Sequence, residues 1–148
     1  MRPAIPARDF FVSTWTTTLE PDEVLTAVRY PVWEGSCGFA VEEFARRSGD
    51  FAIAGVACAL EVDTDARVGR AAIALFGMAP TPVRAGDAEA ALLGKPAGQA
   101  DLAEVARAAV AATEPAEDIH GNAPFRRRVA SHLIQRALTR ALEEAAHA

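Results

Sequence analysis

The sequence has few cysteines and no apolar run long enough to cross a membrane. Cys37 and Cys58 are the only two among 148 residues. A chain of this length buries roughly 68–70% of its unfolded surface, so it needs neither a disulfide framework nor a metal to fold. With no secretory signal and no transmembrane segment, we expect reduced thiols in a cytoplasmic protein. Each cysteine is predicted to be a small buried apolar side chain and not a catalytic group.

Positive charge is also scarce. The 15 Lys and Arg residues are outnumbered by 20 Asp and Glu, which gives a net charge of −5 and a pI near 5.2. This balance argues against nucleic acid and against anionic membrane surfaces as partners. Hydrophobic residues make up 51% of the chain, as in ordinary globular proteins, and the length fits one domain covering residues 1–148.

The motifs that usually carry cofactors or metals are missing. Neither G-x-G-x-x-G nor G-x-x-x-x-G-K-[ST] occurs, so the common glycine-rich phosphate loops are absent. The three histidines are scattered, and neither cysteine has a partner at ligand spacing, so we predict no metal site. His132 and His147 are expected on a helix and at a frayed terminus. His120, in a polar loop, is the one histidine considered for function.

The first half of the chain predicts strands. Residues 1–22 are expected to be irregular. Period-two alternation predicts strands at 23–33 and 38–47, the first with Val24, Thr26, Val28 and Tyr30 on one face. A long apolar strand at 51–62 and another at 70–79 flank the turn residues 63–69, so 51–77 is expected to be an antiparallel hairpin.

From residue 87 onward the apolar period becomes helical. We predict a short helix that Gly94 ends, a second that Asp101 begins, and a long one at 125–148 after the polar loop 115–124. Strands at about 23–78 followed by helices at about 87–145 indicate an α+β fold. It should have an antiparallel sheet of three or four strands with three helices packed on one face.

Three arginines stand at 126–128, where the last helix begins. Cations near a helix N-terminus oppose the helix dipole by roughly 0.3–1 kcal/mol each, so a counter-charge is expected. Glu117 and Asp118 are both near in sequence, and Asp118 is the nearer. We predict that Asp118 accepts hydrogen bonds from one of these arginines or from backbone N–H groups at the helix start.

Five segments, in order and at fitting distances, resemble one family. They are "PARDFF" at 6–11, "TTLEPDEVLTAVRYP" at 17–31, "GFAVEEFARRSGDFAIAGVACAL" at 38–60, "GMAPTPVRAGDAEAALLG" at 77–94 and "FRRRVASHLIQRAL" at 125–138. Together they resemble the C-terminal domain of the FAD-binding medium subunit of the molybdenum hydroxylases, a group that includes carbon monoxide dehydrogenase and xanthine dehydrogenase. The resemblance covers essentially the whole chain.

The resemblance implies a place in an electron-transfer complex. In that family, substrate is hydroxylated at a molybdenum cofactor, and electrons pass through iron–sulfur clusters to FAD on the medium subunit. The implied partners are an FAD-binding N-terminal domain or chain, an iron–sulfur small subunit and a molybdenum large subunit. The chain is expected to lack the FAD-binding N-terminal domain, to be part of an oxidoreductase and not to be catalytic alone.

The resemblance also implies cofactor-binding residues. Phe51, after Gly49 and Asp50, matches a usually aromatic position that contacts FAD, and Leu19 matches a second flavin contact. Where relatives have a lysine, this chain has Glu43, which reverses a charge expected near the FAD pyrophosphate. The predicted cofactor-binding set is therefore Leu19, Glu43, Asp50 and Phe51. The isolated chain is expected to be colourless and to bind FAD weakly or not at all.

Two functions follow from these observations. The first is the C-terminal part of a flavoprotein subunit, which helps to enclose FAD shared with another domain. The alternative is a non-catalytic binding or assembly module retained from such a subunit. For Phe51 and Leu19, simple core packing is the competing explanation.

Overall fold

The centre of the molecule is a four-stranded antiparallel sheet. The computed structural model describes residues 4–148. The strands are β3 (Ser36–Phe44), β4 (Ala54–Val62), β5 (Val68–Phe76) and β6 (Val83–Arg84), in the spatial order β3-β4-β5-β6. The α+β class and the antiparallel sheet are confirmed. The fourth strand is β6, which lies beyond the predicted range of strands.

The predicted hairpin is confirmed in β4 and β5. Their residues pair antiparallel, and the turn between them is closed by Asp63, whose Oδ1 accepts from the N–H groups of Asp65 and Arg67 at 2.9 Å. Burial alternates over Val56, Cys58 and Leu60 in β4 and over Ala71, Ile73 and Leu75 in β5. One face of the sheet therefore supplies core residues and the other does not.

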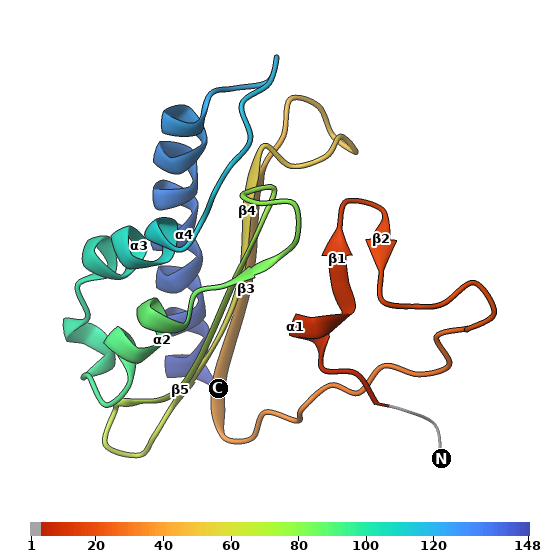
Figure 1. The fold of residues 1–148 in the computed structure, drawn as a ribbon. Coiled ribbons are helices and arrows are strands. Elements are labelled where there is room, and N and C mark those ends of the chain that lie inside the picture. Colours follow the sequence, from red (N-terminus) through yellow and green to blue (C-terminus); the bar gives the residue numbers. More distant parts are fainter. Residues whose placement is uncertain (1–3) are drawn as a thin grey trace.

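Three helices cover one face of this sheet, as predicted. They are α2 (Gly86–Leu92), α3 (Leu102–Ala111) and α4 (Ala123–His147), with a short 3₁₀ turn, η1 (Ala97–Gln99), between the first two. In Figure 1 the sheet is seen nearly edge-on, and all three helices lie on the same side of it. No helix within residues 4–148 combines the length and the apolar character that crossing a bilayer requires.

The helix ends follow from local chemistry. Asp101 caps α3, since its Oδ1 accepts from the N–H groups of Ala103 and Glu104 at 3.0 Å. Gly94 adopts φ +72° just after α2, a left-handed conformation that favours glycine. Asn122 caps α4 by accepting from the N–H of Phe125 at 2.9 Å, so this helix begins two residues before the predicted start.

Close contact between α4 and β3 depends on small residues. A Cβ atom at Gly38 would overlap the backbone carbonyl of Ala141. The helix backbone therefore rests directly on the strand, and only glycine fits at that position. The buried face of α4 is correspondingly rich in alanine: Ala130, Ala137, Ala141 and Ala145.

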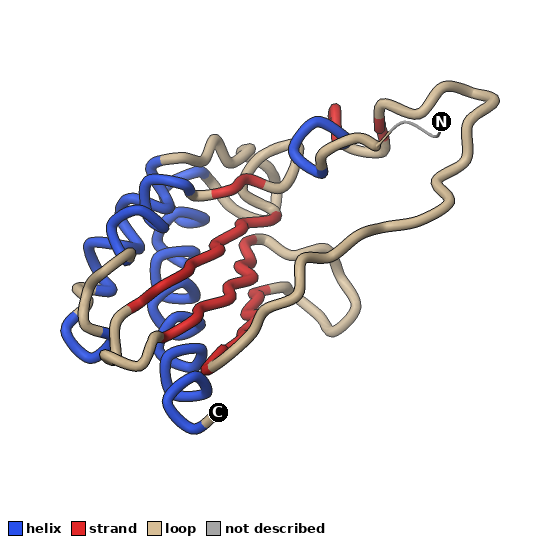
Figure 2. Tube along the Cα trace, turned by 90° about the horizontal axis from the view of Figure 1, so that it is seen from below, coloured by secondary structure: helices blue, strands red, loops and turns tan. Residues whose placement is uncertain are grey.

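The N-terminal region lies on the other side of the sheet. A single helical turn, α1 (Ala7–Phe10), leads into a small antiparallel hairpin of β1 (Phe11–Ser13) and β2 (Thr16–Thr17). Figures 1 and 2 both place this region away from the helices, joined to β3 by a long loop. The irregular conformation predicted for residues 1–22 is wrong for these short elements, and residues 1–3 lie outside the described part of the chain.

The strand predicted at 23–33 is wrong. These residues form no regular element, and every one of them from 23 to 32 is exposed. The reason is physical: a strand is stable only when its backbone pairs with a neighbouring strand, and this segment pairs with none among the described residues. Alternating sequence alone does not supply that neighbour.

Candidate functional site

The loop 45–53, between β3 and β4, holds the centre of the predicted site. The N–H of Ile53 donates to the carbonyl of Phe44 at 2.8 Å and closes the loop, while the N–H of Asp50 donates to the carbonyl of Arg47 at 3.2 Å. Gly49 makes the sharp turn with φ +87°. This geometry lifts Phe51 off the sheet and leaves its side chain 84% exposed.

A second aromatic ring meets Phe51 from the N-terminal hairpin. Trp15, in the turn between β1 and β2, is 88% exposed, and its ring centroid lies 6.0 Å from that of Phe51 in an edge-to-face arrangement. Thr14, Trp15 and Phe51 line a hollow of about 290 Å³. Segments about 35 residues apart in sequence therefore form one apolar surface.

Trp15 was missed by the sequence reasoning, although a signal was present. The residue adopts φ +61°, a left-handed conformation that costs a non-glycine residue about 1–2 kcal/mol. Such strain clusters at functional sites. A tryptophan among threonines in a short turn was the available clue, but its meeting with Phe51 depends on the path of the chain.

Asp50 and Leu19, two other residues of the predicted set, lie outside the hollow. Asp50 is exposed in the same loop as Phe51. Leu19 follows β2, is half-buried, and its N–H donates to Thr17 Oγ1 at 3.4 Å. Leu19 does not line the hollow. Asp50 is the sequence neighbour of Phe51 but does not line the hollow either, so the structure brings Trp15 to Phe51 and to no other predicted residue.

Glu43 lies on the open face of the sheet. It pairs with Gly55 in the neighbouring strand, and Gly55 pairs in turn with Phe76, whose ring covers the glycine. Glu43 is exposed. Because side chains alternate along a strand, Glu42 points the other way, toward the helices. Glu43, the position where the resemblance leads us to expect a lysine, therefore lies on the same side of the sheet as the hairpin.

The neighbouring Glu42 has a structural role. It is buried against α4, where its carboxylate accepts hydrogen bonds from Arg136 and from Arg140, the latter at 2.6 Å. These bonds hold the pKa of the Glu42 carboxyl below its ordinary value. Glu42 therefore links β3 to α4 through ion pairs, and only Glu43 of the two acids lies on the open face.

Arg126 ties the loop of Phe51 to the rest of the domain. It is buried, and its Nη1 donates to the carbonyl of Ile53 at 2.7 Å and to that of Gly77 at 3.3 Å. Its Nη2 forms an ion pair with Asp118 Oδ2 at 2.7 Å. One guanidinium thus joins the start of β4, the end of β5 and the loop before α4.

The predicted role of Asp118 is confirmed. Besides the ion pair with Arg126, its Oδ1 accepts the backbone N–H of His120 at 2.8 Å. The His120 N–H, and then the Arg126 guanidinium, hold the pKa of the Asp118 carboxyl below its ordinary value. His120 itself is exposed, and its Nδ1 lies 3.5 Å from Arg46 Nη1 in the loop of Phe51. The histidine therefore borders the site without entering the hollow.

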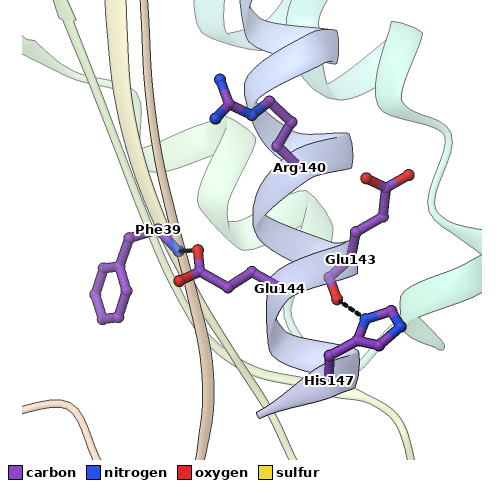
Figure 3. A pocket seen from close by; sticks show the side chains of 5 residues that line it. All are labelled: Phe39, Arg140, Glu143, Glu144 and His147. Atoms are coloured by element: carbon purple, nitrogen blue, oxygen red, sulfur yellow. Dashed lines mark hydrogen bonds between the residues drawn. The ribbon is translucent and has the colours of Figure 1, made fainter.

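A second hollow, of about 530 Å³, lies where the end of α4 passes β3. Figure 3 shows the side chains around it. The N–H of Phe39 donates to Glu144 Oε2 at 2.8 Å, and His147 Nδ1 lies 2.6 Å from the backbone carbonyl of Glu143. These bonds are internal to the fold. The first of them occupies an N–H of the edge strand β3 that would otherwise be open to pairing.

The cysteines are structural. Cys58 is buried, and burial raises the pKa of its thiol to about 11. Cys37 is half-buried, its Sγ donates to the carbonyl of Glu34 at 3.2 Å, and burial raises its pKa as well. Raised pKa values disfavour the reactive thiolate. Within residues 4–148 no group of three or more His, Cys, Asp or Glu side chains is arranged to hold a metal ion.

The fold and the exposed surface define a class. A sheet covered by helices on one face, with exposed aromatic rings beside the open face, is typical of an α+β domain that packs against another part of a protein. The chain belongs to the family of the CO dehydrogenase flavoprotein C-terminal domain, whose family model matches residues 39–141.

Known proteins agree with this assignment. The chain is 36% identical over 140 residues to the carbon monoxide dehydrogenase medium chain of Hydrogenophaga pseudoflava, covering 95% of this chain and 48% of that protein. It is 33% identical to the 6-hydroxypseudooxynicotine dehydrogenase complex subunit alpha of Paenarthrobacter nicotinovorans, with coverage of 95% and 48%. A solved structure of carbon monoxide dehydrogenase from Hydrogenophaga pseudoflava superposes with a TM-score of 0.88 at 39% identity, covering 95% of this chain and 48% of that one. The chain therefore spans about half the length of the relatives it matches.

Proposed function

We propose that this chain is the C-terminal part of a flavoprotein subunit of a molybdenum hydroxylase, where it covers one side of an FAD held by a separate flavin-binding half. The observation that carries the proposal is the exposed pair of Trp15 and Phe51 beside the hollow. Phe51 stands where the family resemblance expects a flavin contact. Two large rings this exposed are rare on a surface that has no partner.

The residues fit one part of FAD and not the other. Trp15 and Phe51 offer an apolar surface to an aromatic ring system. A hollow of about 290 Å³ lies below the usual range for a whole ligand, so it suits a ring and not a complete dinucleotide. A pyrophosphate requires converging N–H donors or fixed cations, and the open face of β3 presents the acid Glu43.

This division assigns roles to the chain's residues. Phe51 and Trp15 exclude water from one side of the flavin, and Leu19 extends that apolar cover. Asp50, exposed beside Phe51, is an acceptor for a polar group of the cofactor. Arg126 acts through the backbone of Ile53 and holds the loop that carries both residues.

When bound, FAD would pass electrons from iron–sulfur clusters to an acceptor. The partners that follow are the flavin-binding half, an iron–sulfur small subunit and a molybdenum large subunit. The names of the two relatives, carbon monoxide dehydrogenase and 6-hydroxypseudooxynicotine dehydrogenase, give different substrates for subunits of the same family.

A chimaeric medium chain tests the proposal. In it, this chain replaces the half of the Hydrogenophaga pseudoflava medium chain that it matches. We expect the chimaera to retain FAD and Phe51→Ala to weaken FAD binding about tenfold to a hundredfold, because an apolar contact of roughly 1.5–3 kcal/mol is lost. Flavin fluorescence during equilibrium titration measures the affinity.

The matched control is Leu93→Ala. Leu93 is also an exposed apolar residue, but it follows α2 on the helix-covered side of the sheet. We expect this variant to bind FAD as the unmodified chimaera does. A folded chimaera whose FAD affinity is unchanged by Phe51→Ala would contradict the proposal and favour an assembly module without a flavin role.

A further inference from the structure

The loop of Phe51 and the loop 112–122, between α3 and α4, lie at the same end of the sheet, as Figure 1 shows. Within residues 4–148 the backbones of these two loops share no hydrogen bond. Their contact is made by side chains, since Arg46 Nη1 lies 3.5 Å from His120 Nδ1. Neither of these side chains lines the hollow, so the contact is separate from the apolar surface of Trp15 and Phe51.

His120 stands on a tight turn whose shape is fixed by its neighbours. Asp118 and Gly121 exchange two backbone hydrogen bonds at 3.2 Å, and Asp118 Oδ1 accepts the N–H of His120 at 2.8 Å. The other carboxylate oxygen of Asp118 is paired with the buried Arg126. A Cβ atom at Gly121 would come within 2.7 Å of the ring of Phe125, so the turn rests directly on α4. The place of the imidazole is thus set by the core of the domain and not by the neighbouring loop.

The loop of Phe51, in contrast, is held firmly only at its base. Its last residue, Ile53, is hydrogen-bonded through both its N–H and its carbonyl. Farther out, residues 46–51 are all exposed, and the backbone hydrogen bond among them is internal to the loop. Within residues 4–148, Arg46 therefore makes the one hydrogen bond that joins this outer part to another element.

This contact depends on the charge of the imidazole. A guanidinium carries hydrogen-bond donors only, so His120 Nδ1 must accept, and the ring proton stands on Nε2. Protonation of the ring would place an N–H on both nitrogens and would add a positive charge. The ring would then face Arg46 with a second donor and a like charge. Neutral His120 therefore holds Arg46, and the charged form does not.

The other charges near His120 do not replace this contact. Asp118 is the acid bonded to the same turn, and the His120 N–H and then the Arg126 guanidinium hold the pKa of its carboxyl below the ordinary value. Asp118 therefore stays ionised between about pH 5 and pH 8, where histidines change charge, and its charge is already matched by Arg126. The remaining charged groups on the elements that meet here are Glu117 on the same loop, Arg47 and Asp50 on the loop of Phe51, and Arg127 and Arg128 on α4.

We propose that neutral His120 positions the outer part of the Phe51 loop by holding Arg46, and that protonation of the imidazole releases this part while the base stays fixed. His120 is a positioning residue, because it does not line the hollow and acts through Arg46. The consequence for the cofactor rests on the proposed function, in which Phe51 covers the flavin. In acid, the edge-to-face contact with Trp15 alone would hold the ring of Phe51, and the cover would be looser.

Nuclear magnetic resonance of the chain tests the positioning without a cofactor. Between about pH 8 and pH 5, we expect the backbone amide resonances of Gly49 and Phe51 to shift with the same midpoint as the imidazole resonances of His120. The nuclear Overhauser effect between the rings of Phe51 and Trp15 should weaken over the same range. His120→Asn keeps an acceptor oxygen near the place of Nδ1 without a titratable ring, so both responses should disappear. Loop resonances that shift equally in this variant would overturn the proposal.

Two further variants complete this measurement. Arg46→Ala removes the donor, so its loop amides should already have at pH 8 the shifts that the unmodified chain reaches at pH 5. His132→Asn is the matched control, because His132 is exposed on α4, and it should leave the response of the loop unchanged. Loop amides that are unaffected by Arg46→Ala, or a response that is lost in His132→Asn, would contradict the role given to His120.

The chimaeric medium chain shows the effect on the cofactor. Between about pH 8 and pH 5, FAD affinity should fall about twofold to fivefold more in the unmodified chimaera than in its His120→Asn variant. The difference is small because the contact joins two exposed side chains. An equal fall in both proteins would overturn the link between His120 and the flavin cover.

The outcomes separate this inference from the proposed function. Loop amides that do not follow His120 refute the positioning, whatever Phe51→Ala does to FAD affinity. Loop amides that follow His120, together with an FAD affinity that Phe51→Ala leaves unchanged, refute the flavin cover and support the positioning.

Discussion

Residues 4–35 and residues 36–148 contain similar apolar side chains but use them in opposite ways. In the larger region the side chains form one continuous core that begins at Ala40, whereas none of residues 4–35 is buried. In the N-terminal region the apolar groups face outward, and two of its aromatic rings, Trp15 and Tyr30, are 88% and 83% exposed. Residues 36–148 are stabilised by their own packing, whereas residues 4–35 expose their apolar side chains.

The contrast shows that alternating apolar residues do not by themselves make a segment a buried strand. Val56 and Leu60 in β4 are buried because α4 lies across their strand. Val24 and Val28 have the same spacing within their segment but no helix or strand against them. A period of two indicates that a segment can serve as a strand with one apolar face, and the opposing surface must come from elsewhere.

The largest effect on stability is expected when a core residue is truncated, in comparison with a residue of the exposed N-terminal region. Leu60→Ala removes a fully buried side chain and should lower the free energy of unfolding by about 2–5 kcal/mol, through lost transfer energy and a cavity. Leu25→Ala, in the exposed segment, should change it by no more than about 0.5 kcal/mol. Urea unfolding followed by circular dichroism measures both. A comparable loss for Leu25→Ala would show that the N-terminal region packs on the domain.

The next effect concerns the anchor of the Phe51 loop. Arg126→Ala leaves the carbonyls of Ile53 and Gly77 without their donor and should lower the free energy of unfolding by about 2–3 kcal/mol. Arg127→Ala, at the exposed neighbouring position, is the matched control and should be nearly neutral. Thermal unfolding of the two variants gives the comparison. Equal melting temperatures would mean that the buried guanidinium does not hold the loop.

A smaller effect is expected in the pH dependence of stability, which should differ between the acids on the two faces of β3. The pKa of Glu42 is lowered in the folded state, so its contribution to stability is present above the unfolded value, about 4.3, and is lost as pH falls through the folded pKa. Unmodified protein should therefore lose more free energy of unfolding than Glu42→Gln between about pH 6 and pH 3. Urea unfolding at each pH measures the difference.

The control for that measurement is adjacent in sequence. Glu43→Gln changes the acid on the open face, which has no ion pair among residues 4–148, and should follow the unmodified profile. Asp118 titrates in all three proteins, so its contribution cancels. Parallel profiles for all three would contradict the role given to the Glu42 pairs.

The smallest effect concerns Glu43 and FAD. In the chimaera, Glu43→Lys should strengthen FAD binding about twofold to fivefold, because it replaces a repelling exposed charge with an attracting one near the pyrophosphate. Raising the salt concentration should reduce this gain, since exposed charges are screened. Glu43→Gln should give an intermediate affinity. A weaker affinity for the lysine variant would place the pyrophosphate away from the open face.

Much of the domain could be read from local chemistry. The hairpin of β4 and β5, the helix begun by Asp101 and the stop at Gly94 each depend on a few neighbouring residues, and each was predicted. The pairing of Asp118 with Arg126 was also predicted, because three cations at a helix start required a nearby counter-charge. These features depend on residues that lie close together in the sequence.

By itself, then, the sequence determined the α+β class, the hairpin of β4 and β5 and the three helices that follow the sheet. Phe51, predicted to begin a strand at 51–62, lies in the loop before β4. Only the tertiary structure decided which apolar segments are buried and which stay outside. It left residues 23–33 unpaired, brought Trp15 to Phe51 and set Glu42 and Glu43 on opposite faces. The physical reason is that caps, turns and periodicity are short-range properties, whereas burial and strand pairing require a partner surface whose position depends on the whole chain and on what packs against it.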